Sequence, residues 1–162
     1  MNLQNIKETH LDQKLIFNMN IVICSSIDFT KKIYEVYKIL SLKNHKVHIP
    51  KTTQRIINNE FTLEDFKKEK KNNGDLKFRK LNNGPIKKYF NIIKNSDAIL
   101  VINENKNNIK NYIGANTFLE IAFAHILNKK IYLLNPIPNQ NLSDELKEMD
   151  ITILNGDLNK IN

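Results

Sequence analysis

The sequence predicts an α/β fold in which a five-stranded parallel sheet is covered by helices on both faces. Short runs of apolar, largely β-branched residues alternate along the chain with segments of helical periodicity. The run at residues 98–102 is apolar throughout, which is typical of a central strand that is buried on both faces. Strands that alternate with helices in this way form parallel sheets.

Each expected element rests on a local signal. The apolar runs predict strands at residues 20–24, 47–49, 97–102, 131–134 and 151–154. Helical periodicity and helix-start residues predict helices at residues 28–43, 84–95, 118–128 and 143–149. Asp28 is the expected cap of the first helix, and Pro85 lies in the first turn of the second. The segment 118–128 is apolar nearly all round, so we expect a buried helix there.

The length of 162 residues fits one domain, which we place at residues 19–162 after an N-terminal extension of residues 1–18. A short helix is expected around residues 11–17, and the polar, Lys-rich segment 55–82 is expected to be partly helical and mobile. A single cysteine, Cys24, excludes a disulfide framework. The chain start lacks the apolar core of a signal peptide, and the apolar runs are too short to span a bilayer. We therefore expect a cytoplasmic protein with no membrane contact.

The net charge of +8 invites a nucleic-acid interpretation, but its distribution weakens that interpretation. Residues 31–94 carry 17 basic and 6 acidic residues, whereas the rest of the chain carries 8 basic and 11 acidic residues. Only two of the basic residues are arginines, and no aromatic residues interleave with the Lys-rich stretch 67–71. A nucleic-acid-binding module stays a minor alternative, and the positive segment suits a small phosphorylated substrate better than a duplex.

The order of the elements predicts a Rossmann-like sheet with the strand order 2-1-3-4-5. In such sheets ligands bind beyond the carboxyl ends of the strands, where the strand order reverses. This rule selects three loops as candidate ligand sites, at residues 25–28, 103–117 and 135–139.

Glu120 is the candidate catalytic residue. It is the only acidic residue between Glu104 and Asp144, and it lies in a helix that is otherwise built for burial. An ionised carboxylate in such a place is costly unless it has a partner or a task, so it could serve as a nucleophile or a general base. The alternative is structural, because Thr117 and Glu120 have the spacing of a capping box.

The other candidates also have structural alternatives. The run of Gly114, Ala115 and Asn116 would let a ligand approach backbone N–H groups at a helix start, or it is an ordinary turn. Ser25 and Ser26 could bind a phosphate, or they form a helix-capping loop. We expect Cys24 to be a buried structural thiol and His125 to be a core histidine. The four histidines lack metal-binding spacing, so no metal is expected.

With these residues in view, the chain resembles the nucleoside 2-deoxyribosyltransferase-like superfamily, which includes deoxynucleoside 5′-monophosphate N-glycosidases. The resemblance covers residues 20–136 in order and is most specific over residues 96–136, which contain Ser-Asp-Ala-Ile-Leu-Val, Gly-x-Asn-Thr-x-x-Glu-Ile-x-x-Ala and Asn-Lys-Lys-Ile-Tyr-Leu-Leu. It implies a flavodoxin-like Rossmannoid fold and an enzyme that cleaves an N-glycosidic bond without a cofactor.

The resemblance also implies roles for single residues. The family's nucleophilic glutamate falls on Glu120, and the small-residue loop that holds sugar or 5′-phosphate falls on Gly114, Ala115 and Asn116. The loop after the first strand falls on Ser25 and Ser26, and Asn103 would face the sugar. Relatives form dimers or larger assemblies, so we expect a homo-oligomer, with Tyr112 and Phe118 as candidate interface residues.

Two carboxylates of the family pattern are missing, and the loop after the first strand reads Cys-Ser-Ser without the glycine that is typical of phosphate-binding relatives. The acid that assists departure of the base falls on Tyr89, and an aspartate that deoxyribosyltransferases carry before the nucleophile falls on Gly114. Loss of general-acid help can reduce a rate by ~10²–10⁴-fold. The sequence therefore leaves open a non-catalytic nucleotide-binding or sensor protein with the same fold.

Overall fold

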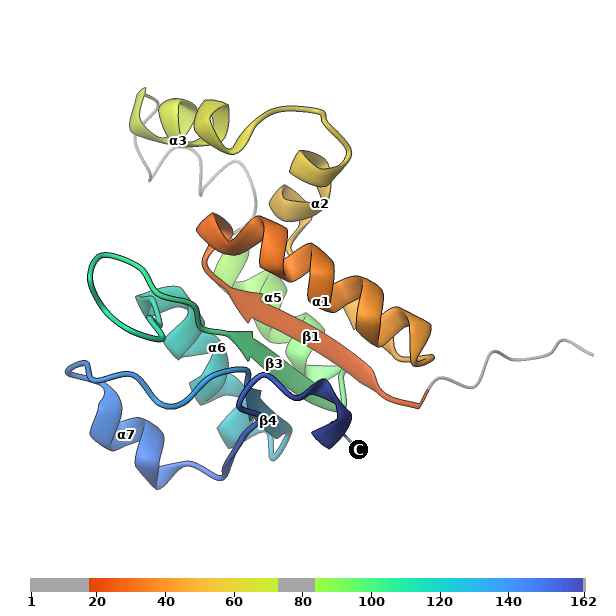
Figure 1. Cartoon of the computed structure of the whole chain (residues 1–162), viewed down its shortest axis with the longest axis vertical. Helices are drawn as coiled ribbons and strands as arrows, with labels where there is room; N and C mark the ends of the chain where they lie inside the picture. Colours follow the sequence, from red (N-terminus) through yellow and green to blue (C-terminus); the bar gives the residue numbers. More distant parts are fainter. Residues whose placement is uncertain (1–17, 73–83, 162) are drawn as a thin grey trace, which may run out of the picture.

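The computed structural model describes residues 18–72 and 84–161, which form a five-stranded, all-parallel sheet with helices around it (Figure 1). The strand order is β2-β1-β3-β4-β5, which confirms the predicted order and the α/β fold class. Every strand lies within one residue of its expected bounds. The strands are β1 Asn20–Ser25, β2 Lys46–His48, β3 Ala98–Ile102, β4 Lys130–Leu133 and β5 Ile151–Ile153.

The central strands divide their side chains between two cores. In β1, Ile21 and Ile23 belong to one buried cluster, whereas Val22 and Cys24 belong to the other. This division follows the period of two residues along a strand. All five residues of β3 are buried, as the unbroken apolar run predicted. The sheet is therefore covered on both faces at its centre.

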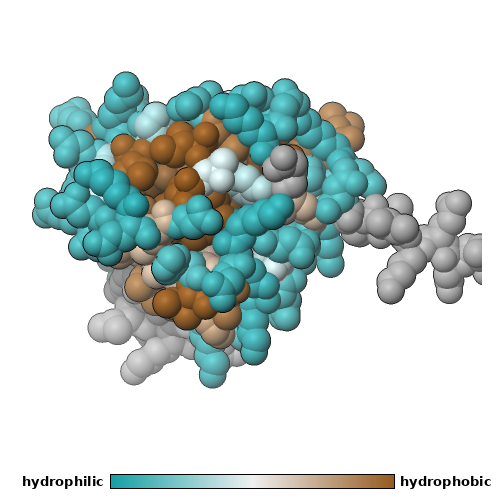
Figure 2. Space-filling model, turned by 90° about the horizontal axis from the view of Figure 1, so that it is seen from below, coloured by the Kyte–Doolittle hydropathy of each residue, from teal (hydrophilic) through white to brown (hydrophobic). Residues whose placement is uncertain are grey.

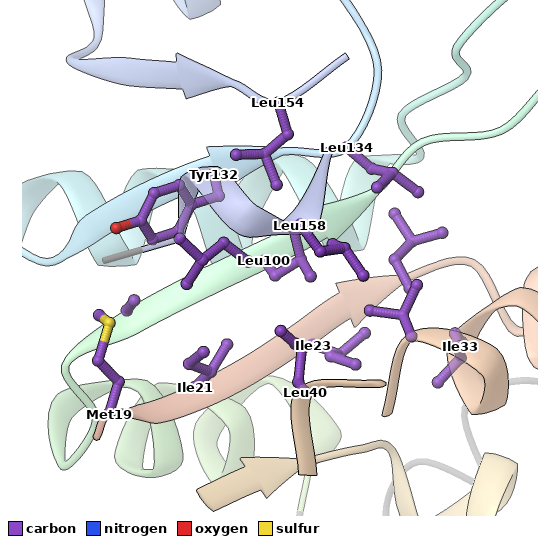
Figure 3. Close-up of a cluster of buried hydrophobic side chains, with 14 residues drawn as sticks. Met19, Ile21, Ile23, Ile33, Leu40, Leu100, Tyr132, Leu134, Leu154 and Leu158 are labelled. Carbon is purple, nitrogen blue, oxygen red and sulfur yellow. The ribbon is translucent and has the colours of Figure 1, made fainter. Parts of the chain in front are cut away.

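The first face of the sheet is covered by one long helix and a short C-terminal turn. Helix α1 (Thr30–Leu42) buries Ile33, Val36 and Leu40, whose spacing gives one apolar stripe. The 3₁₀ turn η2 (Leu158–Lys160) adds Leu158 to the same cluster. Figure 3 shows Ile33, Leu40 and Leu158 gathered against side chains of the strands, such as those of Ile23 and Leu100.

Three helices cover the second face, namely α5 Pro85–Lys94, α6 Ala115–Ile126 and α7 Ser143–Glu148. Each contributes a fully buried apolar residue to the second core, and these are Ile93, Ile121 and Leu146. The rings of Phe90 and Phe123 meet edge to face with centroids 5.3 Å apart, which joins α5 to α6.

Two further helices lie between β2 and α5 in the chain, α2 (Lys51–Ile57) and α3 (Leu63–Asn72). Helix α3 has no buried residue and lies apart from the sheet in Figure 1. The expected partial helix in residues 55–82 is therefore present up to Asn72. The remainder of that segment and the helix expected at residues 11–17 lie outside the described residues.

Asparagine ends several helices of this chain in place of glycine. All of the non-glycine residues with positive φ in the described part of the chain are asparagines, and they are Asn44, Asn59, Asn107, Asn108, Asn111, Asn128 and Asn155. Three of them follow the ends of α1, α2 and α6. Beyond each, the next backbone N–H donates to a carbonyl five residues back, as in His45 to Leu40. These are Schellman-type endings, in which a left-handed residue closes the last turn.

Helix α6 differs from its prediction in two respects. It begins at Ala115 instead of residue 118, because Gly114 is extended and takes the N-cap position. It is also not buried all round, since Leu119 is 39% and Ile126 is 78% exposed. His125 is exposed as well, so its assignment to the core was wrong. The sheet and α5 cover only part of the helix surface, which leaves its other apolar residues at the surface.

Apolar side chains reach the surface elsewhere too. The space-filling view from below shows hydrophobic areas among the hydrophilic side chains that cover most of that face (Figure 2). None of the helices in residues 18–72 and 84–161 has the length and apolar character needed to cross a membrane.

The two-sided burial of β3 gives a test of the fold. Leu100 is fully buried in the first core, whereas Leu42 at the end of α1 is 88% exposed. We expect Leu100→Ala to lower the free energy of unfolding by about 2–5 kcal/mol, because the cavity left behind adds to the lost transfer energy. Leu42→Ala should change it by less than about 0.5 kcal/mol. Urea denaturation of both variants measures the difference, and equal losses would contradict the assigned burial.

Candidate functional site

The candidate site lies where β1 and β3 end side by side. These strands pair in parallel from Ile21↔Ala98 to Ser25↔Ile102, so their following loops leave the sheet at the same edge. The chain passes from β1 to β2 on one side of β1 and returns to β3 on the other. This is the switch point at which open α/β sheets bind ligands.

A cavity of about 550 Å³ opens at this edge. Four parts of the chain supply its walls: the segment after β1, α2 and α3, the start of α5, and the β3–α6 loop with the first turns of α6. The lining residues that the chemistry below uses are Ser25, Ser26, Asp28, Lys67, Lys70, Tyr89, Lys106, Tyr112, Gly114, Ala115, Asn116, Thr117 and Glu120. A cavity of this volume can hold a nucleoside-sized ligand.

The structure brings six of the seven predicted site residues to this cavity. They are Ser25, Ser26, Gly114, Ala115, Asn116 and Glu120. Asn103 is the exception, because it is fully buried and does not line the cavity. Its Nδ2 donates to the carbonyl oxygens of Asn135 and Pro136 at 3.1 and 3.0 Å. Its side-chain amide therefore joins the end of β3 to the loop after β4.

Glu120 faces the cavity and does not close a capping box. Since α6 begins at Ala115, Thr117 is the third residue of the helix and Glu120 the sixth, and no side chain caps the helix start. The capping-box spacing thus falls inside the helix, where it has no free helix end to close. The structural alternative for Glu120 is wrong, and a half-buried carboxylate at the cavity wall is what the structure has in its place.

Burial raises the pKa of Glu120 to about 7, and a hydrogen bond from the Cys24 thiol opposes the rise. Cys24 is fully buried on β1, and burial together with Glu120 raises the pKa of the thiol well above its usual value. The thiol therefore stays protonated and acts as a donor to the carboxylate. A carboxylate that titrates near neutral pH can serve as a base or a nucleophile under physiological conditions.

Tyr89 also lines the cavity, near Cys24 and Glu120. Its hydroxyl donates to the carbonyl oxygen of Ile23 at 3.4 Å. Burial raises its pKa well above the usual value, and the neighbouring Cys24 and Glu120 raise it further. The phenol is therefore neutral at all pH values of interest, and it is a weak proton donor.

Asp28 does not cap α1, so that prediction was wrong. It lies in the 3₁₀ turn η1 (Ile27–Phe29), whose cap is Ser26. Its carboxylate instead forms ion pairs with Lys67 of α3 and with Lys106 of the β3–α6 loop, the latter at 2.5 Å. Burial alone would raise the pKa of Asp28, but the hydrogen bonds and charges of Lys106 and Lys67 outweigh it and lower the pKa to about 2.

Asp28, Lys67 and Lys106 form a charged cluster, and the sequence analysis named neither lysine as a site residue. Lys106 could have been selected, because it lies in the loop 103–117 that the topology identifies as a candidate ligand site. Lys67 gave no comparable signal, since it belongs to a Lys-rich stretch that is typical of a solvated helix face. The described residues contain no group of three or more His, Cys, Asp or Glu side chains that could hold a metal ion.

Comparison with known proteins adds no relative: no family model, no curated protein and no solved structure matches the chain.

The raised pKa of Glu120 predicts a stability cost at high pH. A carboxyl group whose pKa is higher in the folded state disfavours folding once it ionises, so the unfolding free energy falls as the pH rises from about 4.5 to 7. Glu120→Gln removes this cost. We expect the variant to be more stable than wild type at pH 8 by about 1–3 kcal/mol, with the gap closing below pH ~4. This is less than the full ~1.4 kcal/mol per pKa unit, because solvent screens a half-buried side chain.

Chemical denaturation at pH 4 and pH 8 measures this difference. Glu148→Gln is the matched control, because Glu148 is exposed at the end of α7. A stability gain at pH 8 that is the same for both variants would contradict the burial of the Glu120 carboxylate.

Proposed function

We propose that the protein cleaves the N-glycosidic bond of a nucleoside or nucleotide, with Glu120 as the nucleophile. The observation that supports this most is the half-buried carboxylate with a pKa of about 7 on the wall of the switch-point cavity. The resemblance of residues 96–136 to the nucleoside 2-deoxyribosyltransferase-like superfamily, if it reflects membership, implies the same residue as the nucleophile.

In the first step a carboxylate oxygen of Glu120 attacks the anomeric carbon of the sugar. The carbon–nitrogen bond breaks, the electron pair leaves with the base, and the base takes up a proton. The product is a glycosyl ester of Glu120. In the second step the oxygen of a water molecule attacks the same carbon, the ester bond breaks, and one proton is released. Attack by the nitrogen of a second base would make the reaction a transfer.

The residues around Glu120 suit this chemistry. Ser25 donates its hydroxyl to the carbonyl oxygen of Ile102 at 2.9 Å, which fixes its oxygen at the ends of β1 and β3. Gly114 and Ala115 present no large side chain at the start of α6, so a sugar could approach the backbone there. The hydrogen bond from Cys24 would hold the carboxylate of Glu120 in one orientation.

The described lining residues offer little help in protonating the base as it leaves. The lining residues that the structure describes include two carboxylates, Glu120 and Asp28, and Asp28 is held by two lysines. Tyr89 occupies the position of the family's acid, and its phenol is a weak donor. Turnover should therefore be slow unless the base leaves without protonation by the protein. This observation favours a second candidate, a protein that binds nucleotides without cleaving them.

We expect the enzyme to act in the cytoplasm as a homodimer or larger homo-oligomer, with no cofactor. Ile86 of α5 and Leu119 of α6 line the cavity and are 41% and 39% exposed. A second copy that covered these two side chains would also narrow the cavity opening.

Glu120→Ala should abolish release of free base. We would incubate the wild-type protein with deoxynucleosides and their 5′-monophosphates and follow the base by chromatography. Removal of the nucleophile should reduce the rate at least ~10³-fold, because Asp28, the other carboxylate among the described lining residues, is held by two lysines. Glu148→Gln should keep the wild-type rate. Equal rates for wild type and Glu120→Ala would exclude Glu120 as the nucleophile.

The second candidate predicts a different result with the same ligands. A non-catalytic binder should be stabilised by a nucleotide, by about 2.7 kcal/mol at a ligand concentration of 100 Kd, and should release no base. A thermal-shift assay beside the chromatography separates the two candidates.

The pH dependence gives an independent test of the nucleophile. Only ionised Glu120 can attack, so kcat/KM should rise about tenfold per pH unit below a pKa of about 7 and level off above it. A profile that is flat between pH 5 and pH 8 would show that a different group limits the reaction.

A further inference from the structure

Two lysines from distant parts of the chain meet at the opening of the cavity. Lys67 comes from α3 and Lys106 from the β3–α6 loop, and both form ion pairs with Asp28 of η1. Lys70, one turn after Lys67, lines the same cavity. The carboxylate of Asp28 therefore joins η1, α3 and the β3–α6 loop.

The contacts hold the ammonium group of Lys106 in a defined place. Its Nζ lies 2.5 Å from Oδ2 of Asp28 and donates to Oγ of Ser26 at 3.1 Å. It also lies 5.1 Å from the centre of the Tyr112 ring, which favours a cation. An ammonium group has three N–H donors, and Lys67 has the same capacity beside it. The ammonium groups of Lys67 and Lys106 can therefore donate hydrogen bonds to a second anion next to Asp28.

Charge is distributed unevenly across the cavity. Three lysines and two carboxylates are among its described lining residues, and Glu120 is half ionised near pH 7. The side chain of Lys67 is 54% exposed, so its positive group lies toward solvent, whereas that of Lys106 is 27% exposed and lies deeper. The start of α6 lines the same cavity and adds the positive end of a helix dipole. A ligand with one anionic end would be oriented with that end outward.

We propose that Lys67 and Lys106, with Ser26, form an anion subsite that binds the phosphate group of the substrate. The subsite rests on the proposed function for the identity of the rest of the ligand. It is separate from the loop of Gly114, Ala115 and Asn116, to which the resemblance assigns sugar or phosphate. The lysines act as point charges on the phosphate oxygens. The Ser26 hydroxyl donates to Oδ2 of Asp28 at 3.2 Å, and it would supply a further contact by turning from that carboxylate to the phosphate.

Asp28 sets the strength of this subsite. Its carboxylate holds the same two ammonium groups that the phosphate would contact, so it competes with the ligand and repels it. Loss of a lysine should therefore weaken binding of the phosphate, whereas loss of the Asp28 carboxylate should strengthen it. A purely structural role of the cluster would not produce this reversal.

The test measures binding without turnover. In the Glu120→Gln background, isothermal titration calorimetry compares a deoxynucleoside with its 5′-monophosphate, and inorganic phosphate serves as a competitor. We expect the monophosphate to bind at least about tenfold more tightly than the nucleoside. Lys106→Met and Lys67→Met should each weaken monophosphate binding about 3- to 20-fold, with the larger effect for the less exposed Lys106. Asp28→Asn should tighten it about 3-fold or more.

Lys68→Met is the matched control, because Lys68 is exposed on α3 next to Lys67 but does not line the cavity. It should leave monophosphate binding within twofold of its parent, and all variants should leave nucleoside binding unchanged. Equal losses for Lys67→Met and Lys68→Met, equal binding of the two ligands, or no binding of either would overturn the subsite. Lysine-dependent binding together with no base release by the wild-type protein would support the subsite and overturn only the proposed reaction.

Discussion

The parallel pairing of β1 with β3 is the constraint on which the rest of the molecule depends. Five residues of each strand are in register, from Ile21 to Ser25 and from Ala98 to Ile102, and both strands are buried on both faces. This pairing separates the two cores. It also sets two loops side by side at the carboxyl edge, where Ser25 and Ile102 are hydrogen-bonded although they are 77 residues apart in the chain. The two loops form part of the wall of the cavity that opens at this edge.

Glu120 shows how the fold and the chemistry oppose each other. The first turns of α6 are anchored by Thr117 and Ile121, which are buried. Glu120 lies between these residues on the same helix and is therefore half-buried, although burial of an ionised carboxylate costs free energy. Burial and the Cys24 thiol act on the carboxylate in opposite directions. The site is thus a compromise between a stable helix and a reactive side chain.

Sequence patterns were sufficient for the sheet and for most of the cavity. The strands and their order follow from short apolar runs, since a buried parallel strand leaves little choice of side chain. The start of α6 did not follow, because Gly114, Asn116 and Thr117 can all precede a helix. The cluster of Asp28, Lys67 and Lys106 did not follow either. Its members are far apart in the sequence, and only tertiary structure brings such charges together.

The asparagines that close the helices affect the chain before it folds. Glycine is free to adopt both signs of φ in an unfolded chain, so fixing it in a left-handed turn loses much entropy. Asparagine tolerates the left-handed region but explores fewer conformations when unfolded. Turns such as those at Asn44 and Asn128 therefore have less disorder to lose. Part of what keeps this sheet folded is accordingly a restriction on its denatured ensemble.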